Sequence, residues 1–280
     1  MKRLIITLGL VLSSACSGGL ADLRPEMMQT RSADSAAIER GRTLLQRMYD
    51  AHGGLERWEQ FNFVHAKASD EWFNSLFWAL ASPYEENPEH VFVASYTQQF
   101  PHARLEFPGG DNAGHTWVVK GNRLTTKAPS APSEAEDLRD AALKATFIHN
   151  FLLWPNVPFQ LATADHAIYV GEGKWDGKNF DRVLISWGSL EPNTETDQWE
   201  LWINKDTQLL ERVRFTIRMF DESAVAGYNL KEFKTIQGLT IATVYEGLAD
   251  PDDEDPLHTY TFSDIEFSRR QDADLMRVAP

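Results

Sequence analysis

Residues 198–220 read QWELWINKDTQLLERVRFTIRMF, and this stretch decides the fold. In its second half, Val213, Phe215 and Ile217 alternate with charged or polar side chains. Such a period of two places successive side chains on opposite faces of a β-strand. The first half alternates in a similar way, and the polar residues 204–208 between the halves are typical of a hairpin turn. We expect strands with one face buried and one face in water.

The same alternation recurs along most of the chain and predicts a long antiparallel meander. Turn signals such as Gly121-Asn122 and Gln237-Gly238 separate neighbouring alternating stretches. Further strands are expected at residues 65–72, 90–98, 103–107, 115–120, 123–127, 167–171, 180–187, 228–236, 239–247 and 258–267.

Two longer helices are expected to accompany the sheet. Residues 37–51 carry apolar side chains at helical spacing and end at His52-Gly53-Gly54, as glycine-terminated helices do. Residues 134–151 follow Ser133, a favourable N-cap, and Glu136 three positions later completes a capping box. The apolar stripe of this second helix must be buried, and the apolar face of the sheet is the available surface.

The first 15 residues read as a signal peptide. Two basic residues precede a nine-residue apolar run, residues 4–12, which is too short to span a bilayer. The small residues that lead to Cys16 resemble the lipobox of bacterial lipoproteins, in which cleavage leaves a lipid-carrying cysteine. Cleavage after Ala15 without lipid is the alternative. The resemblance to Gram-negative lipoproteins implies sorting to the outer membrane, because Ser17 and not aspartate follows the cysteine. Residues 16–36 are mostly small or polar and are expected to be a lipid-anchor tether.

Composition excludes several classes of protein. The chain has 280 residues, 27 basic and 41 acidic side chains and a net charge of -14. An acidic chain without a basic run is a poor match for nucleic acid. A single cysteine excludes an intramolecular disulfide framework and multi-cysteine metal sites. No metalloprotease, phosphate-loop or serine-hydrolase motif is present, so neither a cofactor nor a metal is expected.

The remaining polar groups favour structural roles. The eight histidines are scattered, so a metal site would require distant ones to meet, and His52 is expected to cap or pack at a helix end rather than to catalyse. The acidic run 250–255 is expected to be a solvated loop, with calcium binding as the alternative. Asp70 and Glu71 are adjacent, so on a strand they face opposite sides and make a poor acid–base pair.

The short motifs of the chain resemble a known family. They are His52-Gly53-Gly54, residues 55–58 (LERW), 151–155 (FLLWP), 169–172 (YVGE), 176–178 (DGK) and 199–204 (WELWIN), after a secretion signal. Together they resemble secreted bacterial proteins related to the lipoprotein-carrier superfamily of the LolA/LolB type. This resemblance implies an α+β fold, with a strongly curved antiparallel sheet (an incomplete β-barrel) and helices on its concave side over an apolar cavity. It covers residues 37–267, and one domain is expected for 37–280.

The resemblance implies a hydrophobic ligand, and nine tryptophans supply rings that could line an apolar wall. We expect a lipid-anchored binder or carrier of a lipid, acyl chain or lipoprotein at the outer membrane, facing the periplasm; a soluble periplasmic or secreted protein is the alternative. A module that binds an envelope protein is the second hypothesis, and an enzyme ranks last. The expected lid residues are Leu138, Ala142, Ile148 and Phe151, and the expected wall residues are Trp187, Trp199, Phe215 and Ile217.

Overall fold

The computed structural model describes residues 19–29, 34–73, 89–97, 102–109, 113–121, 123–130, 132, 134–137, 154–218 and 221–269. The chain forms two compact units, and each unit is built from three segments. Unit 1 comprises Met1–Met48, Leu161–Asn229 and Gly247–Pro256. Unit 2 comprises Tyr49–Gln160, Leu230–Glu246 and Leu257–Pro280.

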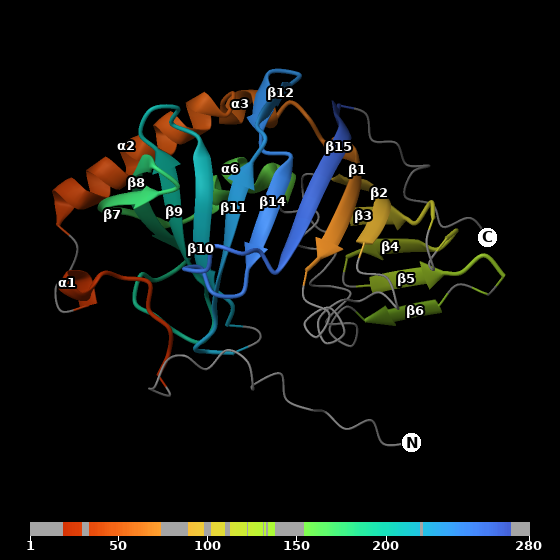
Figure 1. Ribbon diagram of the computed structural model, residues 1–280, viewed down its shortest axis with the longest axis horizontal. Helices are drawn as coiled ribbons and strands as arrows, with labels where there is room; N and C mark the ends of the chain where they lie inside the picture. The colour runs from red at the N-terminus through yellow and green to blue at the C-terminus, as the bar shows by residue number, and fades with distance from the viewer. Residues whose placement is uncertain are drawn as a thin grey trace. The chain divides into compact units, whose positions relative to one another are not determined.

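Unit 1 is built on consecutive antiparallel hairpins (Figure 1). Its neighbouring strands are β7 (His166–Trp175), β8 (Lys178–Ser186), β9 (Gln198–Asn204), β10 (Leu210–Thr216) and β11 (Val225–Lys231), most of which belongs to this unit. Asp176 and Gly177 both adopt positive φ in the β7–β8 turn, a conformation that two-residue hairpin turns require. The alternating residues around Val213 form β10, as predicted.

Helix α2 (Ser35–Ala51) lies against the edge of this sheet, close to the predicted helix 37–51 (Figure 1). Gly41 permits the close approach, because a Cβ there would lie 2.8 Å from the backbone nitrogen of Tyr169. The guanidinium of Arg40 sits 3.6 Å from the centre of the Tyr169 ring and pairs with Asp181 at 3.0 Å. A short helix, α1 (Glu26–Gln29), precedes α2.

Unit 2 is a second antiparallel arrangement. Its strands are ordered β6 (Glu134–Asp137), β5 (Arg123–Lys127), β4 (Thr116–Lys120), β3 (His102–Glu106), β2 (Glu89–Thr97), β1 (Phe63–Trp72), β15 (His258–Ser268) and β14 (Val244–Leu248). A separate pair is formed by β12 (Lys234–Ile236) and β13 (Leu239–Ile241). The short helices are α3 (Leu55–Trp58), η1 (Trp154–Asn156) and α6 (Val157–Gln160), and η2 (Leu161–Thr163) follows in unit 1.

Aromatic side chains fill the core of unit 2. The ring of Tyr245 packs against Trp154 and Phe262, with ring centres 5.8 and 5.6 Å apart. Trp58 stacks on Phe159 at 5.7 Å, and the indole nitrogen of Trp58 donates a hydrogen bond to Asn156 at 3.0 Å. These contacts fasten the short helices of unit 2 to one another and to its sheet, which accounts for part of the high tryptophan content.

The predicted helix 134–151 is wrong at its start. Residues 134–137 form strand β6, in which Asp137 lies opposite Arg123 of β5. The capping box is a local signal, and the pairing with a neighbouring strand overrides it here. The rest of the predicted helix, residues 138–151, lies outside the described residues.

The fold class is α+β, with antiparallel strands and few helices, as predicted. Among the described residues, β7 at the edge of unit 1 pairs only with β8, and β6 at the edge of unit 2 pairs only with β5. The strong curvature of the sheet and the single domain 37–280 stay predictions.

Candidate functional site

Three aromatic rings from neighbouring strands of unit 1 stack on one face of the sheet. Trp199 of β9 lies directly opposite Phe215 of β10, and their rings stack with centres 4.7 Å apart. Phe215 also stacks with Tyr228 of β11 at 6.2 Å. We call these three residues the aromatic ladder. Trp199 and Tyr228 are buried and Phe215 is partly buried, so the ladder forms a continuous apolar layer on this face of the sheet.

The same face also carries aliphatic side chains. Ile185 lies opposite Trp199, and both are buried. In the β7–β8 pairing, Ala167 lies opposite Ile185, so Ala167 belongs to this face too. A Cβ on Gly41 of α2 would lie 2.9 Å from the carbonyl oxygen of Ala167. The helix therefore lies along the backbone of the edge strand β7. Its residues Ala37 and Ile38 pack against the cluster of Ile168, Val170 and Leu184, which belongs to the opposite face of the sheet.

Of the predicted wall residues, the structure brings Trp199 and Phe215 into contact. Ile217 follows two positions after Phe215, and both are partly exposed. Trp187 lies just beyond β8, and its indole nitrogen donates to the hydroxyl of Thr163 at 3.0 Å. The remaining predicted site residues lie outside the described residues; they are Cys16, Leu138, Ala142, Ile148 and Phe151.

The opposite face of β9 and β10 is polar and buried, so the predicted exposure of this face to water is wrong. Arg212 is 1% exposed, Glu200 4% and Thr216 0%. Local alternation indicated which side chains share a face, but it could not reveal what covers that face. Two segments far away in the sequence contribute to the cover, the N-terminal residues 21–24 and the loop 250–255.

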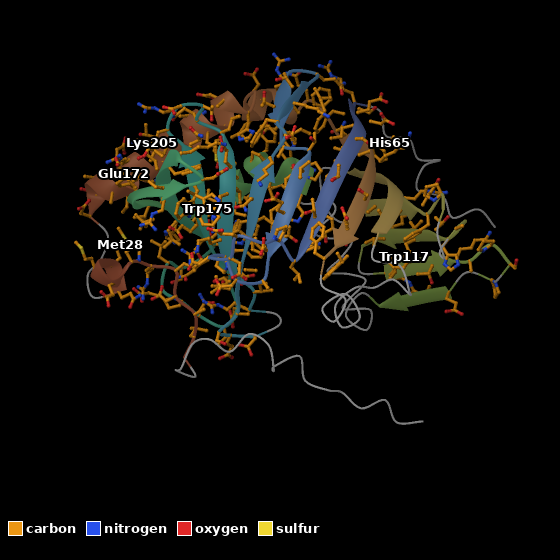
Figure 2. All side chains as sticks on the ribbon, viewed as in Figure 1. Met28, His65, Trp117, Glu172, Trp175 and Lys205 are labelled. Atoms are coloured by element: carbon orange, nitrogen blue, oxygen red, sulfur yellow. The ribbon has the colours of Figure 1, made fainter. Side chains whose placement is uncertain are left out.

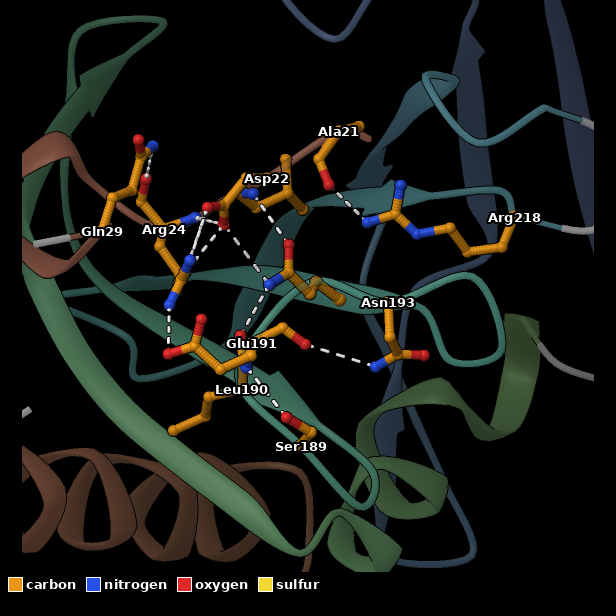
Figure 3. A network of polar contacts seen from close by, with 11 residues as sticks. Ala21, Asp22, Arg24, Gln29, Ser189, Leu190, Glu191, Asn193 and Arg218 are labelled. Atoms are coloured by element: carbon orange, nitrogen blue, oxygen red, sulfur yellow. Dashed lines mark hydrogen bonds and ion pairs between the residues drawn. The ribbon is translucent and has the colours of Figure 1, made fainter. Parts of the chain in front are cut away.

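Residues 21–24 form an N-terminal strap across the end of the sheet (Figure 3). The backbone nitrogen of Leu23 donates to Oε1 of Gln198 at 2.8 Å. The backbone nitrogen of Ala21 donates to the carbonyl of Glu222 at 2.9 Å, and the side chain of Arg218 donates to the carbonyl of Ala21. The strap, which lies within the predicted tether 16–36, is thus hydrogen-bonded to the sheet.

The next strap residues form ion pairs at its outer side. Arg24 pairs with Asp22 at 2.9 Å and with Glu191 at 2.7 Å (Figure 3). The hydrogen bond of Asp22 is the largest cause of the raised pKa of Arg24. Behind them, Leu23 and Met28 pack against a buried cluster on β7 and β8 that includes Ile168.

The acidic run 250–255 exposes its carboxylates, as predicted, but it also contributes a buried residue. Pro251 is buried, and its carbonyl accepts a hydrogen bond from Arg212. Within the described part of the chain, no group of three histidine, cysteine, aspartate or glutamate side chains could hold a metal ion.

His52 packs in unit 2 at the end of α2, as predicted. Its Nδ1 lies 2.5 Å from the carbonyl oxygen of Thr240, and the rings of Phe159 and Phe233 flank it at 6.2 and 6.1 Å. Burial lowers the pKa of His52 to about 4, and the contact with Thr240 opposes that shift. The imidazole is therefore neutral at pH 7 and belongs to the core.

Sequence reasoning missed one buried polar pair in unit 2. Nδ1 of His258 lies 2.8 Å from Oδ1 of Asp70, and Trp72 donates its indole N–H to the second carboxylate oxygen at 2.7 Å. Asp70 is buried and Glu71 is exposed, so the adjacent carboxylates do face opposite sides. The antiparallel register of β1 and β15 places Trp72 opposite His258 and so brings His258 close to Asp70. No local sequence motif indicates this contact.

Among the described residues, no helix is long and apolar enough to cross a membrane.

Comparison with known proteins defines the fold of the chain. No family model matches it, and neither does any curated protein. A DUF1329 family protein from Desulfovibrio piger aligns over 86% of this chain and 97% of its own, with a TM-score of 0.55 and 11% identity. A proposed outer membrane lipoprotein-sorting protein domain from Vibrio parahaemolyticus aligns over 86% of this chain and 100% of its own, with a TM-score of 0.52 and 10% identity.

A LolA superfamily protein from Nitrosomonas europaea aligns over 85% of this chain and 97% of its own, with a TM-score of 0.49 and 12% identity. At these identities, similarity to a solved structure establishes the fold and no more. The chain has the fold of the Vibrio and Desulfovibrio proteins, so its resemblance to the lipoprotein-carrier type is confirmed at the level of the fold.

Proposed function

We propose that this protein is a lipid-anchored binder or carrier of a hydrophobic ligand at the periplasmic side of the outer membrane. The observation that carries the proposal is the aromatic ladder formed by Trp199, Phe215 and Tyr228. The fold shared with the Vibrio sorting domain supports the same class of ligand. The lipid anchor would be attached to Cys16.

Binding would depend on the burial of apolar surface. Each Å² of apolar surface that leaves water contributes about 25 cal/mol to the free energy of binding. This contribution depends on the buried area and not on the exact shape of an acyl chain. Phe215 lies at the centre of the ladder and contacts a ring on each side. An acyl chain placed along the ladder would contact three strands at once. The predicted lid residues Leu138, Ala142, Ile148 and Phe151 would close over it.

The test is native mass spectrometry of the Cys16→Ser protein, purified without detergent, followed by organic extraction and lipid analysis. The N-terminal strap should be kept, because residues 21–24 are hydrogen-bonded to the sheet. We expect a lipid or acyl compound at near-unit stoichiometry. A protein that stays unliganded after incubation with envelope lipids would contradict the proposal, and a stoichiometric co-purifying protein would favour the alternative of an envelope assembly module.

A substitution at the ladder makes the test specific. Phe215→Asp places a charge between two aromatic rings and should abolish loading with ligand, because burying an unpaired carboxylate is costly. Phe73→Asp is the matched control, because Phe73 is 55% exposed and lies outside the ladder. Circular dichroism establishes that both variants fold. Equal ligand content in the two variants would exclude the ladder as the binding wall.

A further inference from the structure

The polar face of unit 1 carries three arginines on β8 and β10, the two strands that flank β9. The register aligns Arg182 of β8, Trp202 of β9 and Arg212 of β10 in one row across the sheet. Glu200 and Arg214 are opposite each other in the neighbouring row. Side chains in these rows share one face, so the three guanidinium groups surround the same patch of sheet.

Negative charge inside this cluster is scarce. Glu200 pairs with Arg182 at 3.0 Å and lies 3.8 Å from Arg214. It is the one buried carboxylate among the described residues that faces the three arginines, whereas Asp252, which contacts Arg214 at 3.3 Å, has a side chain that is 73% exposed. The cluster thus has a local positive excess in a chain whose net charge is -14.

Several guanidinium nitrogens in the cluster are buried without a hydrogen-bond partner among the described residues. They are Nε and Nη1 of Arg212, Nε of Arg182 and Nε of Arg214. A buried donor without an acceptor destabilises the folded protein, and a charged donor does so more strongly. Burial and the neighbouring Arg214 lower the pKa of Arg212 to about 10. The excess positive charge and the unpaired guanidinium donors indicate that the cluster could bind one further anion.

Two tryptophans hold the central arginine in place. The guanidinium of Arg212 lies 3.5 Å from the centre of the ring of Trp175, the last residue of β7 (Figure 2). The ring of Trp202 lies 5.5 Å from the same guanidinium. Gly173 makes space for Trp202, because a Cβ there would lie 2.5 Å from its ring. A stacked guanidinium has a fixed plane, which favours bidentate recognition of tetrahedral anions.

The loop 250–255 places oxygen atoms on two of these arginines. The carbonyl of Pro251 accepts from Arg212, and the carboxylate of Asp252 accepts from Arg214. Gly227 lets the loop approach, since a Cβ there would lie 3.0 Å from Pro251. The loop therefore covers two of the three arginines and supplies oxygen acceptors to both.

We propose that Arg182, Arg212 and Arg214 form a binding site for a phosphate group, and that the loop 250–255 opens when phosphate oxygens replace those of Pro251 and Asp252. A phosphate carries up to two negative charges and several acceptor oxygens, which match the unpaired donors. The arginine face and the aromatic ladder lie on opposite faces of the sheet, so this site is independent of the proposed apolar ligand.

The test uses the soluble Cys16→Ser protein and separates two sources of the phosphate group. Calorimetry with inorganic phosphate, against sodium chloride at matched ionic strength, detects binding of a free phosphate. Co-sedimentation with phosphatidic acid vesicles, against phosphatidylcholine vesicles, detects binding of a lipid headgroup. Saturable binding in either arm supports the site and identifies the source. Absence of binding in both arms would overturn it.

Variants with opposite expected effects make the assignment specific. Arg214→Gln and Arg182→Gln should each weaken phosphate binding about tenfold, as expected for the loss of one charged contact. Asp252→Asn should tighten it about two- to fivefold, because it removes an exposed competing carboxylate. Asp253→Asn, on the exposed part of the same loop, is the matched control and should change nothing. Equal affinity of Asp252→Asn and wild type would overturn the role of the loop.

Discussion

The ring of Trp199 stacks on the ring of Phe215 at 4.7 Å, directly across the β9–β10 pair. Stacked rings contribute about 1 kcal/mol beyond the area they bury. We expect the double-mutant cycle of Trp199→Leu and Phe215→Leu to give a coupling energy of about 1 kcal/mol in urea unfolding. The pair Trp187→Leu and Phe215→Leu serves as the control and should show coupling near zero. Additive effects in the first cycle would contradict the stacking.

Gly173 should be intolerant of a side chain. A Cβ at this position would lie 2.5 Å from the ring of Trp202, and forced packing in a core typically costs about 2 kcal/mol. We expect Gly173→Ala to lower the free energy of unfolding by about that amount in urea denaturation. Gly109→Ala is the matched control, because no atom lies within 4 Å of its added Cβ. Equal stability of both variants would mean that Trp202 can move aside.

Acid should destabilise unit 2 through His52. The pKa of His52 is about 4 in the folded protein, below its ordinary value of 6.5, so the unfolded chain takes up the proton first. The contribution of the neutral imidazole to the free energy of unfolding is complete above pH 6.5 and is lost as the pH falls towards 4. We expect His52 to contribute a loss of about 2 kcal/mol between pH 7 and pH 5.

The measurement is the difference in pH dependence between wild type and His52→Leu in urea unfolding. Other titrating groups cancel in this difference, which leaves the contribution of His52. Parallel pH curves for the two proteins would disprove the burial of a neutral His52.

The N-terminal strap should open when its side-chain partner is removed. Gln198 is 1% exposed, accepts from Leu23 and donates to the carbonyl of Leu190 at 2.8 Å. We expect Gln198→Ala to increase hydrogen exchange of the strap amides at least tenfold, as a lost hydrogen bond of about 1.4 kcal/mol would. Gln29→Ala removes only an exposed contact with Arg24 and should leave the exchange of these amides unchanged.

Membrane attachment should depend on Cys16. Two or more acyl chains hold a protein on a membrane durably, because each buried CH₂ contributes ~0.8 kcal/mol. We expect Cys16→Ser to move the protein from the membrane fraction to the soluble fraction, whereas Ser17→Ala should leave it in the membrane. A membrane-bound Cys16→Ser protein would contradict the anchor.

Much of the fold could be predicted because hairpins are local. The turn at Gly121 joins β4 and β5, and the alternation around Val213 forms β10, as expected. The capping box at Glu136 led to a wrong prediction of a helix at residues 134–137. These residues form a strand because they pair with β5, and the local sequence does not encode that pairing. The face of β10 that carries Arg212 and Arg214 was predicted to be exposed to water. Alternation identifies which residues share a face, but it does not show which distant segments pack on that face.

In the candidate site, too, contacts between neighbouring strands could be predicted from the sequence, whereas contacts between distant segments could not. Trp199 and Phe215 were predicted from alternation and meet across one strand pair. The contact of Arg212 with Pro251 joins residues 39 positions apart, and the pair of Asp70 with His258 spans 188 positions. Contacts of this kind arise from register between distant strands, which a single sequence does not encode in any local pattern.

The N-terminal strap has a kinetic consequence for a protein anchored through Cys16. The first strap hydrogen bond, at Ala21, is five positions after the cysteine, so the free segment spans at most roughly 17 Å. A tether this short keeps the sheet beside the bilayer and makes the capture of a membrane component an intramolecular event. Effective concentrations for short linkers are on the order of millimolar, so a binding face of modest intrinsic affinity would be filled from the adjacent membrane.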